Sequence, residues 1–335
     1  MSRSPLPAAA LRGLGSRTFF SLRKYPDFRV LWAGNVGTML GQWVQFAAQG
    51  YLVYQLSGSP FQVGVVGFLA GVASIVTSPF AGLITDRFSR RSVLMTITII
   101  SAAIATALAL LIVADLIEMW MLYPIALLEG VTAALGQPAR QVMVYDVVEQ
   151  EDLANAVAIN SLGSNTMRIV GPSLAGALIG TVGIEAAFAL QAAAYVLSVL
   201  ATSRIRTKGM PTPGATASVL RSMADGISYA RSNSDVWLLV LMAGLPSLLV
   251  YPYVQYIPVF ADRVLHTGSV GFGFLASAVG YGSIIGAVLA ANLTTLKKRG
   301  QILVWTTFIY MALVTAFAIS NVYWLSFSLL VVAGI

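Results

Sequence analysis

Apolar segments follow one another along most of the chain, separated by short polar breaks. Windows of about 20 apolar residues, the length that crosses a hydrocarbon core as a helix, recur ten times. The predicted spans are 29–56, 61–84, 92–114, 119–144, 153–181, 185–203, 236–260, 268–293, 301–319 and 322–335. The pattern predicts an all-α polytopic membrane protein. The last segment has 14 residues, about 21 Å of helix against a hydrocarbon core of about 30 Å, so we expect it to be incomplete.

Composition supports this fold class. The chain is 57% hydrophobic and 10% charged, with a mean hydropathy of +0.80, which excludes a soluble domain. Of its 20 Lys and Arg, all but Arg168 and Arg263 lie on one side of the membrane by alternation of the spans. The positive-inside rule makes that side the cytoplasm. We therefore expect a multi-pass protein of the cell membrane with a cytoplasmic N-terminus. In a soluble chain the net charge of +7 would suggest nucleic-acid binding, but the basic residues here lie in alternate loops, so we expect no nucleic-acid partner.

The longest connection divides the chain. It covers about 204–235 and contains Pro211, Pro213 and Gly214 before a predicted surface helix. The predicted units are a cytoplasmic tail (1–28), a six-helix bundle (29–203), the cytoplasmic connection (204–235) and an incomplete second bundle (236–335). The tetrapeptide at 67–70 recurs at 273–276, which places the second helix opposite the eighth, as two parallel repeats require.

Enzyme chemistry finds little support in the residues. The chain has no cysteine, and His266 is its single histidine, so neither thiolate catalysis nor a Cys or His metal cluster is expected. There is no P-loop, which argues against direct drive by ATP. We expect no enzyme activity, no metal and no cofactor.

One dense group of charges lies between the second and third spans. It reads Gly-x-x-x-Asp-Arg-x-x-Arg-Arg over residues 82–91, and we expect a short loop at the membrane surface, because charges inside hydrocarbon are costly. The spacing resembles the loop motif of the major facilitator superfamily, with Ser89 where that family usually has Gly. The resemblance implies a fold of two six-helix bundles, so that about ten of twelve helices are present here. It also implies a cytoplasmic conformational latch formed by Gly82, Asp86, Arg87, Arg90 and Arg91.

Two charged residues fall inside predicted spans. Glu129 lies midway along the fourth and Arg168 midway along the fifth, at comparable depth, and intramembrane charges commonly pair. We expect an ion pair between them. Its role stays open between a structural clamp of two helices and a part in proton or substrate coupling.

Polar side chains form stripes on three spans. Spacings of three and four residues put each set on one helix face, where a central cavity or interhelical hydrogen bonding would satisfy it. The predicted cavity-lining residues are Asn35, Thr38, Gln42, Gln45 and Gln49 on the first span, Ser161, Ser164 and Asn165 on the fifth, and Ser247, Tyr251 and Gln255 on the seventh.

The fifth span also contains Gly171-Pro172-Ser173-Leu174-Ala175-Gly176. This segment resembles the Gly-Pro motif of drug and proton antiporters in the same superfamily, although Met167 and Ala175 depart from it. Physically, Pro172 bends a helix, while Gly171 and Gly176 allow close approach of neighbours, so helix packing explains the segment equally well. The fourth-span pattern of those antiporters is missing, because Ala126 stands where they have Arg.

The segments 28–32, 51–54 and 57–60, which precede the charged motif, look more like the exporter subgroup that contains siderophore exporters and macrolide efflux proteins. That resemblance implies export of a small amphipathic molecule, drug or siderophore-like, by alternating access driven by the proton gradient. The expected partners are the lipid bilayer, the substrate and protons, and the expected state is a monomer. An uptake symporter of the same fold and a non-transporting fragment remain the alternatives.

Overall fold

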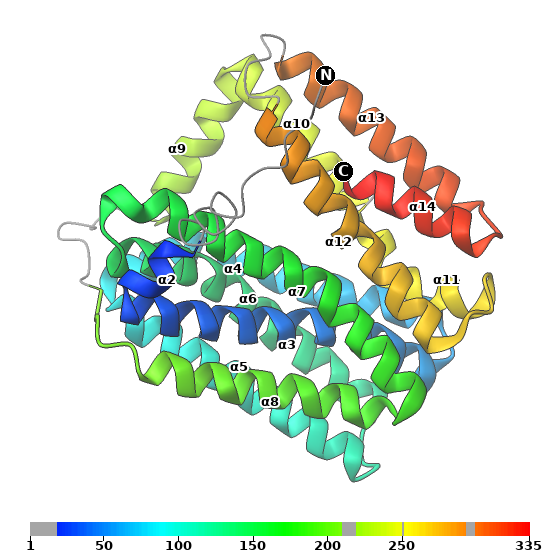
Figure 1. Ribbon diagram of the computed structural model, residues 1–335. Coiled ribbons are helices and arrows are strands. Elements are labelled where there is room, and N and C mark those ends of the chain that lie inside the picture. Colours follow the sequence, from blue (N-terminus) through cyan, green and yellow to red (C-terminus); the bar gives the residue numbers. More distant parts are fainter. Residues whose placement is uncertain (1–18, 210–218, 250, 293–298) are drawn as a thin grey trace, which may run out of the picture.

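The computed structural model describes residues 19–209, 219–249, 251–292 and 299–335, and every element in these ranges is helical (Figure 1). The first half comprises α2 (Phe20–Lys24), α3 (Pro26–Ser57), α4 (Pro60–Arg87), α5 (Arg90–Val113), α6 (Met119–Val147), η1 (Gln150–Asp152), α7 (Leu153–Thr181) and α8 (Ile184–Ser203). The second comprises α9 (Val219–Ser232), α10 (Ser234–Leu249), η2 (Tyr251–Tyr256), α11 (Ile257–Arg263), α12 (Gly268–Asn292), α13 (Arg299–Ala318) and α14 (Tyr323–Gly334).

Local sequence explains where the first helices end. Gly58 closes α3 in the left-handed conformation, with φ of 61°, which favours glycine, and Pro60 opens α4 at a position that needs no N–H donor. The Ser89 hydroxyl caps α5 by accepting from the backbone N–H of Ser92 at 3.3 Å. These breaks lie where the polar punctuation predicted them.

The charged motif is mostly helix and not the loop that the sequence analysis expected. Residues 82–87 form the last turns of α4, only Phe88 and Ser89 separate it from α5, and Arg90 and Arg91 belong to the first turn of α5. The prediction was wrong in this respect because a helix need not end where the hydrocarbon ends. Its last turns can project into the headgroup region with their charges in water.

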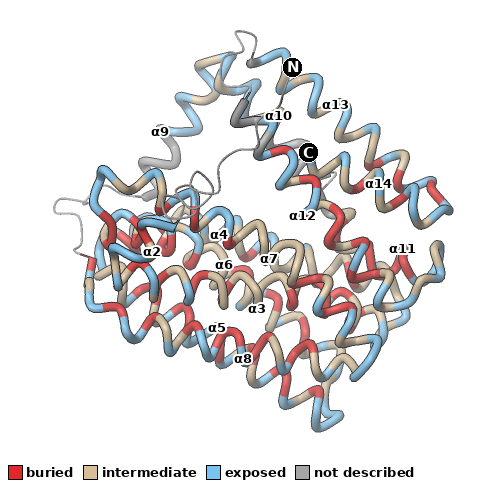
Figure 2. Tube along the Cα trace, viewed as in Figure 1, coloured by how far each residue is buried: buried red, intermediate tan, exposed pale blue. Residues whose placement is uncertain are grey.

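Six of the described helices are long and apolar enough to cross a membrane: α4, α5, α6, α8, α12 and α13. Helices α3 and α7 are longer than most, with 32 and 29 residues, but their polar stripes lower their hydropathy. Buried residues gather between the helices of the first half, and many outward faces are exposed (Figure 2). Those faces carry large apolar side chains such as Phe61, Ile75 and Trp324, exposed by 73%, 69% and 72%, as contact with lipid requires.

The seventh predicted span, 236–260, is not one helix. It divides into α10, the 3₁₀ segment η2 and α11. Pro246, Pro252 and Pro258 recur through it, and each removes a backbone donor that an uninterrupted α-helix would use. The α-helical period on which the predicted stripe depended is therefore interrupted between α10 and α11.

The two halves meet mainly through α7 and α12, with further contacts of η2 and α11 against α3 and α4 (Figure 1). A Cβ atom built on Gly176 would lie 2.5 Å from the Cα of Gly273, so the two backbones touch. Beside them the Ser173 and Ser277 hydroxyls are 2.7 Å apart. These four residues define what we call the interhalf contact. Gly67 of the recurring tetrapeptide packs against Gln255, so both copies of the tetrapeptide face the opposite half.

Candidate functional site

A cavity of about 260 Å³ lies at the centre of the first half and reaches the second half at Gln255. Three predicted residues of α3 line it, namely Gln42, Gln45 and Gln49. Its walls also include Glu129 of α6, Gln191 and Tyr195 of α8, and the apolar side chains of Val53, Val63 and Val66. We call this space the central cavity. Amide groups, one carboxyl and branched apolar groups together suit an amphipathic ligand.

Hydrogen bonds order the polar wall of the central cavity. The amide of Gln191 donates to Oε1 of Gln45 at 2.8 Å, and the amide of Gln49 donates to Oε2 of Glu129 at 3.0 Å. The other carboxylate oxygen of Glu129, Oε1, is buried with no hydrogen-bond partner among the described residues. A buried carboxyl oxygen with an unused lone pair is a costly arrangement, and protonation or a ligand donor would relieve it.

A second space of about 230 Å³ lies between α3, α6 and α7, nearer the end at which α3 begins. We call it the polar pocket. Of the predicted residues, Asn35 lines it from α3, and Ser161, Ser164 and Asn165 line it from α7. Asn35 donates to the side-chain oxygen of Asn160 at 3.1 Å. The pocket also contains three residues that sequence reasoning did not place in a site, Gln137, Arg140 and Gln141 of α6.

An open groove of about 580 Å³ borders both spaces. It shares Gln42 and Ala133 with the central cavity, and Gln137 and Gln141 with the polar pocket. It ends at Gly82 beside the charged motif. The three spaces therefore lie next to one another along α6, between the charged motif and the central cavity.

The structure does not bring Glu129 and Arg168 together, which corrects the predicted ion pair. Among the described residues, the carboxylate of Glu129 accepts a hydrogen bond from Gln49, and the guanidinium of Arg168 lies 5.0 Å from the ring centroid of Trp43. The pairing argument assumed that α6 and α7 are neighbours because they follow each other in sequence. In the fold α3 contacts both of them, and most of the packing of α6 is against α4.

The remaining predicted cavity residues lie elsewhere. Thr38 is buried, and its hydroxyl donates to the carbonyl of Gly34 within α3 at 3.0 Å, so it takes part in helix packing. The side chains of Ser247 and Tyr251 lie outside the described residues, as does that of Asp86. Gly82 faces open space and Arg87 is exposed.

The basic residues at the start of α5 contact the first half itself. Arg90 forms an ion pair with Asp146 of α6, and Nη2 of Arg91 donates to the carbonyl of Ser203 at 2.9 Å. Two arginines in a first helical turn oppose the helix dipole, and the carboxylate of Asp146 offsets that penalty. In this conformation the residues predicted as a latch therefore tie α5 to α6 and α8.

The Gly-Pro segment of α7 packs on both sides. Gly171 touches α3, because a Cβ atom there would lie 2.5 Å from the Cβ of Trp43, whereas Gly176 forms the interhalf contact. Helix α7 continues through Pro172 to Thr181, and the missing N–H of Pro172 leaves the carbonyl of Arg168 without its usual helical donor. The segment thus lets α7 approach one helix of each half.

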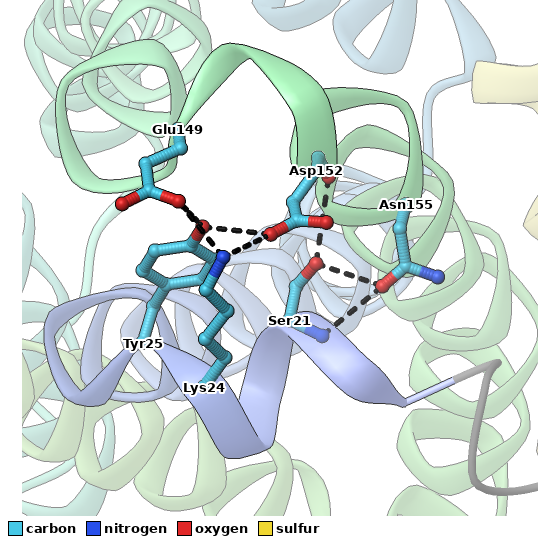
Figure 3. Close-up of polar contacts among 6 residues, drawn as sticks. All are labelled: Ser21, Lys24, Tyr25, Glu149, Asp152 and Asn155. Atoms are coloured by element: carbon cyan, nitrogen blue, oxygen red, sulfur yellow. Dashed lines mark hydrogen bonds and ion pairs between the residues drawn. The ribbon is translucent and has the colours of Figure 1, made fainter.

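A cluster of polar contacts fixes the start of α3 against α7 (Figure 3). Lys24 forms ion pairs of 2.8 Å with both Glu149 and Asp152, and the hydroxyl of Tyr25 donates to the same two carboxylates. Ser21 donates to the side-chain oxygen of Asn155 at 2.8 Å. The hydrogen bonds from Lys24, followed by those from Tyr25, hold the pKa of Glu149 and of Asp152 below their ordinary values. This cluster, the α2 clamp, sets the spacing of the two helices that wall the polar pocket.

Comparison with known families identifies the chain. A family model described as transmembrane secretion effector matches residues 17–335. The chain belongs to this family, within the major facilitator superfamily. The cavities described above therefore lie in a chain of this family.

Relatives of this chain include proteins that are named as transporters or exporters. The staphyloferrin A transporter of Staphylococcus aureus is 24% identical over 265 residues, which cover 78% of this chain and 66% of that protein. The enterobactin exporter EntS of Escherichia coli is 24% identical over 286 residues, 85% of this chain and 68% of that protein. The MFS-type transporter YfiS of Bacillus subtilis is 25% identical over 240 residues, 70% of this chain and 55% of that protein. The chain thus spans about half to two thirds of the length of these curated relatives.

Solved structures give the same fold at lower identity. A bacterial homolog of the human lysosomal transporter Spinster, in an inward-facing and unoccupied conformation, aligns with a TM-score of 0.68 at 16% identity, over 92% of this chain and 71% of that chain. A D-xylose–proton symporter aligns with a TM-score of 0.60 at 14% identity, over 93% and 80%. Both confirm the major facilitator fold.

Sequence reasoning missed Arg140 and its neighbours because they lie near the end of a span. Arg140 was counted only as a basic residue of the cytoplasmic side. Gln137 precedes Arg140 by three residues and Gln141 by four, and these separations put the three side chains on one side of α6. That pattern was the available signal.

Proposed function

We propose that this transporter exports a small amphipathic molecule across the cell membrane by alternating access, with its N-terminus in the cytoplasm. The observation that carries the proposal is the central cavity, where five glutamines and Glu129 share the lining with branched apolar side chains. Such a lining can hold a molecule with one polar and one apolar side. Two relatives, a staphyloferrin A transporter and an enterobactin exporter, support the same class of cargo.

The arrangement of contacts supports a state that opens toward the cytoplasm. The interhalf contact joins the C-terminal part of α7 to the N-terminal part of α12. On the same side, Arg263 of α11 donates to the carbonyl of Gly58 at 2.9 Å and lies over the ring of Tyr54. The distribution of Lys and Arg assigns that side to the outside. The groove opens at the other side, where the charged motif lies.

The charged motif would act when the cytoplasmic side closes. Here Arg90 and Arg91 bind partners within their own half. We infer that closing brings the second half against this end, where Gly82 leaves free space and the charges of Asp86, Arg87, Arg90 and Arg91 can stabilise the closed state. Rocking of the two halves about the central cavity then moves the cargo outward.

Glu129 is our candidate for proton coupling. It faces the central cavity, and one of its carboxylate oxygens is buried without a partner among the described residues. Proton binding would remove a buried charge, and proton release would restore an acceptor for cargo or for Gln49. Loading and release of a proton can thus alternate with loading and release of the cargo.

The test uses bacterial cells that express the full chain, loaded with the fluorescent amphipathic acid 1-pyrenebutyrate. Energised cells should retain less probe than cells with empty vector, and a protonophore should abolish the difference. Glu129→Gln should also abolish it, whereas Glu151→Gln, at an exposed site in η1, should not. Greater retention would indicate uptake, and equal retention at normal expression would refute transport of this class of cargo.

A further inference from the structure

The polar pocket contains a buried positive charge, and none of the described residues that line it carries a negative charge. Arg140 is 4% exposed, and it is the one charged residue among the ten described residues that line the pocket. Its Nε and Nη2 atoms are buried and have no hydrogen-bond partner among the described residues. A guanidinium is always charged at physiological pH and has five N–H donors, so leaving it unpaired in a membrane bundle is unfavourable.

The local sequence makes room for this arrangement. The guanidinium lies over Gly136, one turn earlier on the same helix, where a Cβ atom would be 2.9 Å from Nη1 and 3.3 Å from Cζ. Glycine at this position therefore lets the side chain lie along α6 and face the pocket. Glycine in the interior of a helix lowers the stability of that helix. Gly136 therefore costs α6 some stability, and the space that it leaves for the Arg140 guanidinium gives a reason for its presence.

The other groups in the pocket can donate to the same ligand. The side-chain oxygen of Asn160 already accepts from Asn35, which leaves the amide N–H groups of Asn160 available. The amides of Gln137, Gln141 and Asn165 and the hydroxyl of Ser161 also line the space. A pocket with one guanidinium, several amide donors and no acidic residue in its described lining is built for an anion.

We propose that the polar pocket binds the carboxylate group of the transported molecule, with Arg140 as its principal partner. The planar guanidinium matches the two oxygens of a carboxylate in a paired arrangement. The groove beyond the pocket is lined partly by Ala133, Ala134 and Pro138, which suits the apolar part of the same molecule. This inference rests on the proposed function and narrows its cargo to amphipathic carboxylates.

The position of the pocket defines its place in transport. Glu129 precedes Arg140 by 11 residues, about 16 Å along α6. The carboxylate would bind Arg140 first, from the end where the groove opens, and then move past Gln137 toward the central cavity. The pocket is thus a loading site, separate from the site where Glu129 takes up its proton.

The experiment measures binding on the purified full chain, without transport. Thermal unfolding is followed with 1-pyrenebutyrate, with its uncharged amide and with inorganic phosphate, all at one ionic strength. We expect the carboxylate to raise the unfolding temperature and the amide to do so far less. Arg140→Gln should weaken carboxylate binding about tenfold or more, and Arg140→Lys should restore part of it. Arg29→Gln, at an exposed site of α3, is the matched control and should bind as the native chain does.

A second readout separates a binding role from a structural one. Removing an unpaired buried charge should leave the ligand-free unfolding temperature of Arg140→Gln equal to or above that of the native chain, whereas a structural arginine would lower it. Equal binding of carboxylate and amide, stabilisation by phosphate alone, or undiminished binding by Arg140→Gln would overturn the inference. Binding that depends on Arg140 in a protein that exports nothing would instead refute the proposed function and leave the pocket assignment standing.

Discussion

The interhalf contact gives the sharpest prediction, because it depends on glycine backbones that touch. We consider Gly176→Ala on α7 against the matched control Gly71→Ala on α4. A Cβ atom at position 176 would lie 2.5 Å from both the Cα of Gly273 and the carbonyl oxygen of Ser269, whereas one at position 71 meets nothing within 4 Å. Both changes add the same helix propensity, so their difference isolates the contact.

The structure sets the expected size of the effect. Carbon atoms in contact normally stand about 3.5–4.0 Å apart, so α7 and α12 must separate by about 1 Å to accept the methyl group. The obstructing atoms are backbone atoms and cannot move as a side chain would. Such overpacking costs about 1–3 kcal/mol. Since this cost applies only when the two halves are in contact on this side, it should shift the closed-to-open ratio about 5- to 150-fold toward opening.

Accessibility of a buried thiol measures that shift. Ser277 is 0% exposed and lies in the interhalf contact, and the chain has no native cysteine, so Ser277→Cys reports on this contact alone. A membrane-impermeant maleimide applied from outside the cell should label it faster in the Gly176→Ala background and at an unchanged rate with Gly71→Ala. Equal rates in the two backgrounds, at equal unfolding temperature, would refute the contact as a barrier to external access.

Three further predictions follow from other contacts. Because Glu129 and Arg168 have separate partners, the effects of Glu129→Gln and Arg168→Gln on the free energy of unfolding should add within about 0.5 kcal/mol. Glu129→Gln and Gln49→Ala should instead show a coupling energy of about 1 kcal/mol or more. Strong coupling between the Glu129 and Arg168 substitutions would show that these two residues form an ion pair after all. In the α2 clamp the pKa values of Glu149 and Asp152 are lowered and the pKa of Lys24 is raised, so the clamp should be fully formed between about pH 5 and pH 10 and should weaken as the pH falls through the lowered carboxylate pKa values. A spin label at Phe19→Cys should become more mobile near pH 3. In the Lys24→Gln variant the same label should be mobile at every pH. For topology, an impermeant thiol reagent on intact cells should label Ser57→Cys and spare Ser89→Cys, and the reverse pattern would invert the proposed orientation.

Much of the fold could be predicted from the sequence because its signals are local. Each span is a run of apolar residues, and punctuation such as Gly58 and Pro60 marks the breaks. The stripes of α3 and α7 could also be predicted, because α-helical spacing alone decides which side chains share a face. For this reason Gln42, Gln45 and Gln49 lie together in one cavity. Prolines interrupt the helical period between α10 and α11, and Gln255 of η2, also a predicted cavity residue, lines the same cavity.

Only the tertiary structure decided which faces meet. Sequence order suggested that α6 and α7 are neighbours and would pair Glu129 with Arg168, yet α3 lies against both helices and supplies Gln49 to one charge and Trp43 to the other. It also decided that Arg140, an ordinary basic residue at the end of a span by sequence, is buried in a pocket with no acid in its described lining. Hydropathy and periodicity place a residue on one helix, whereas its partners depend on packing between helices far apart in the chain, and no local pattern encodes that packing.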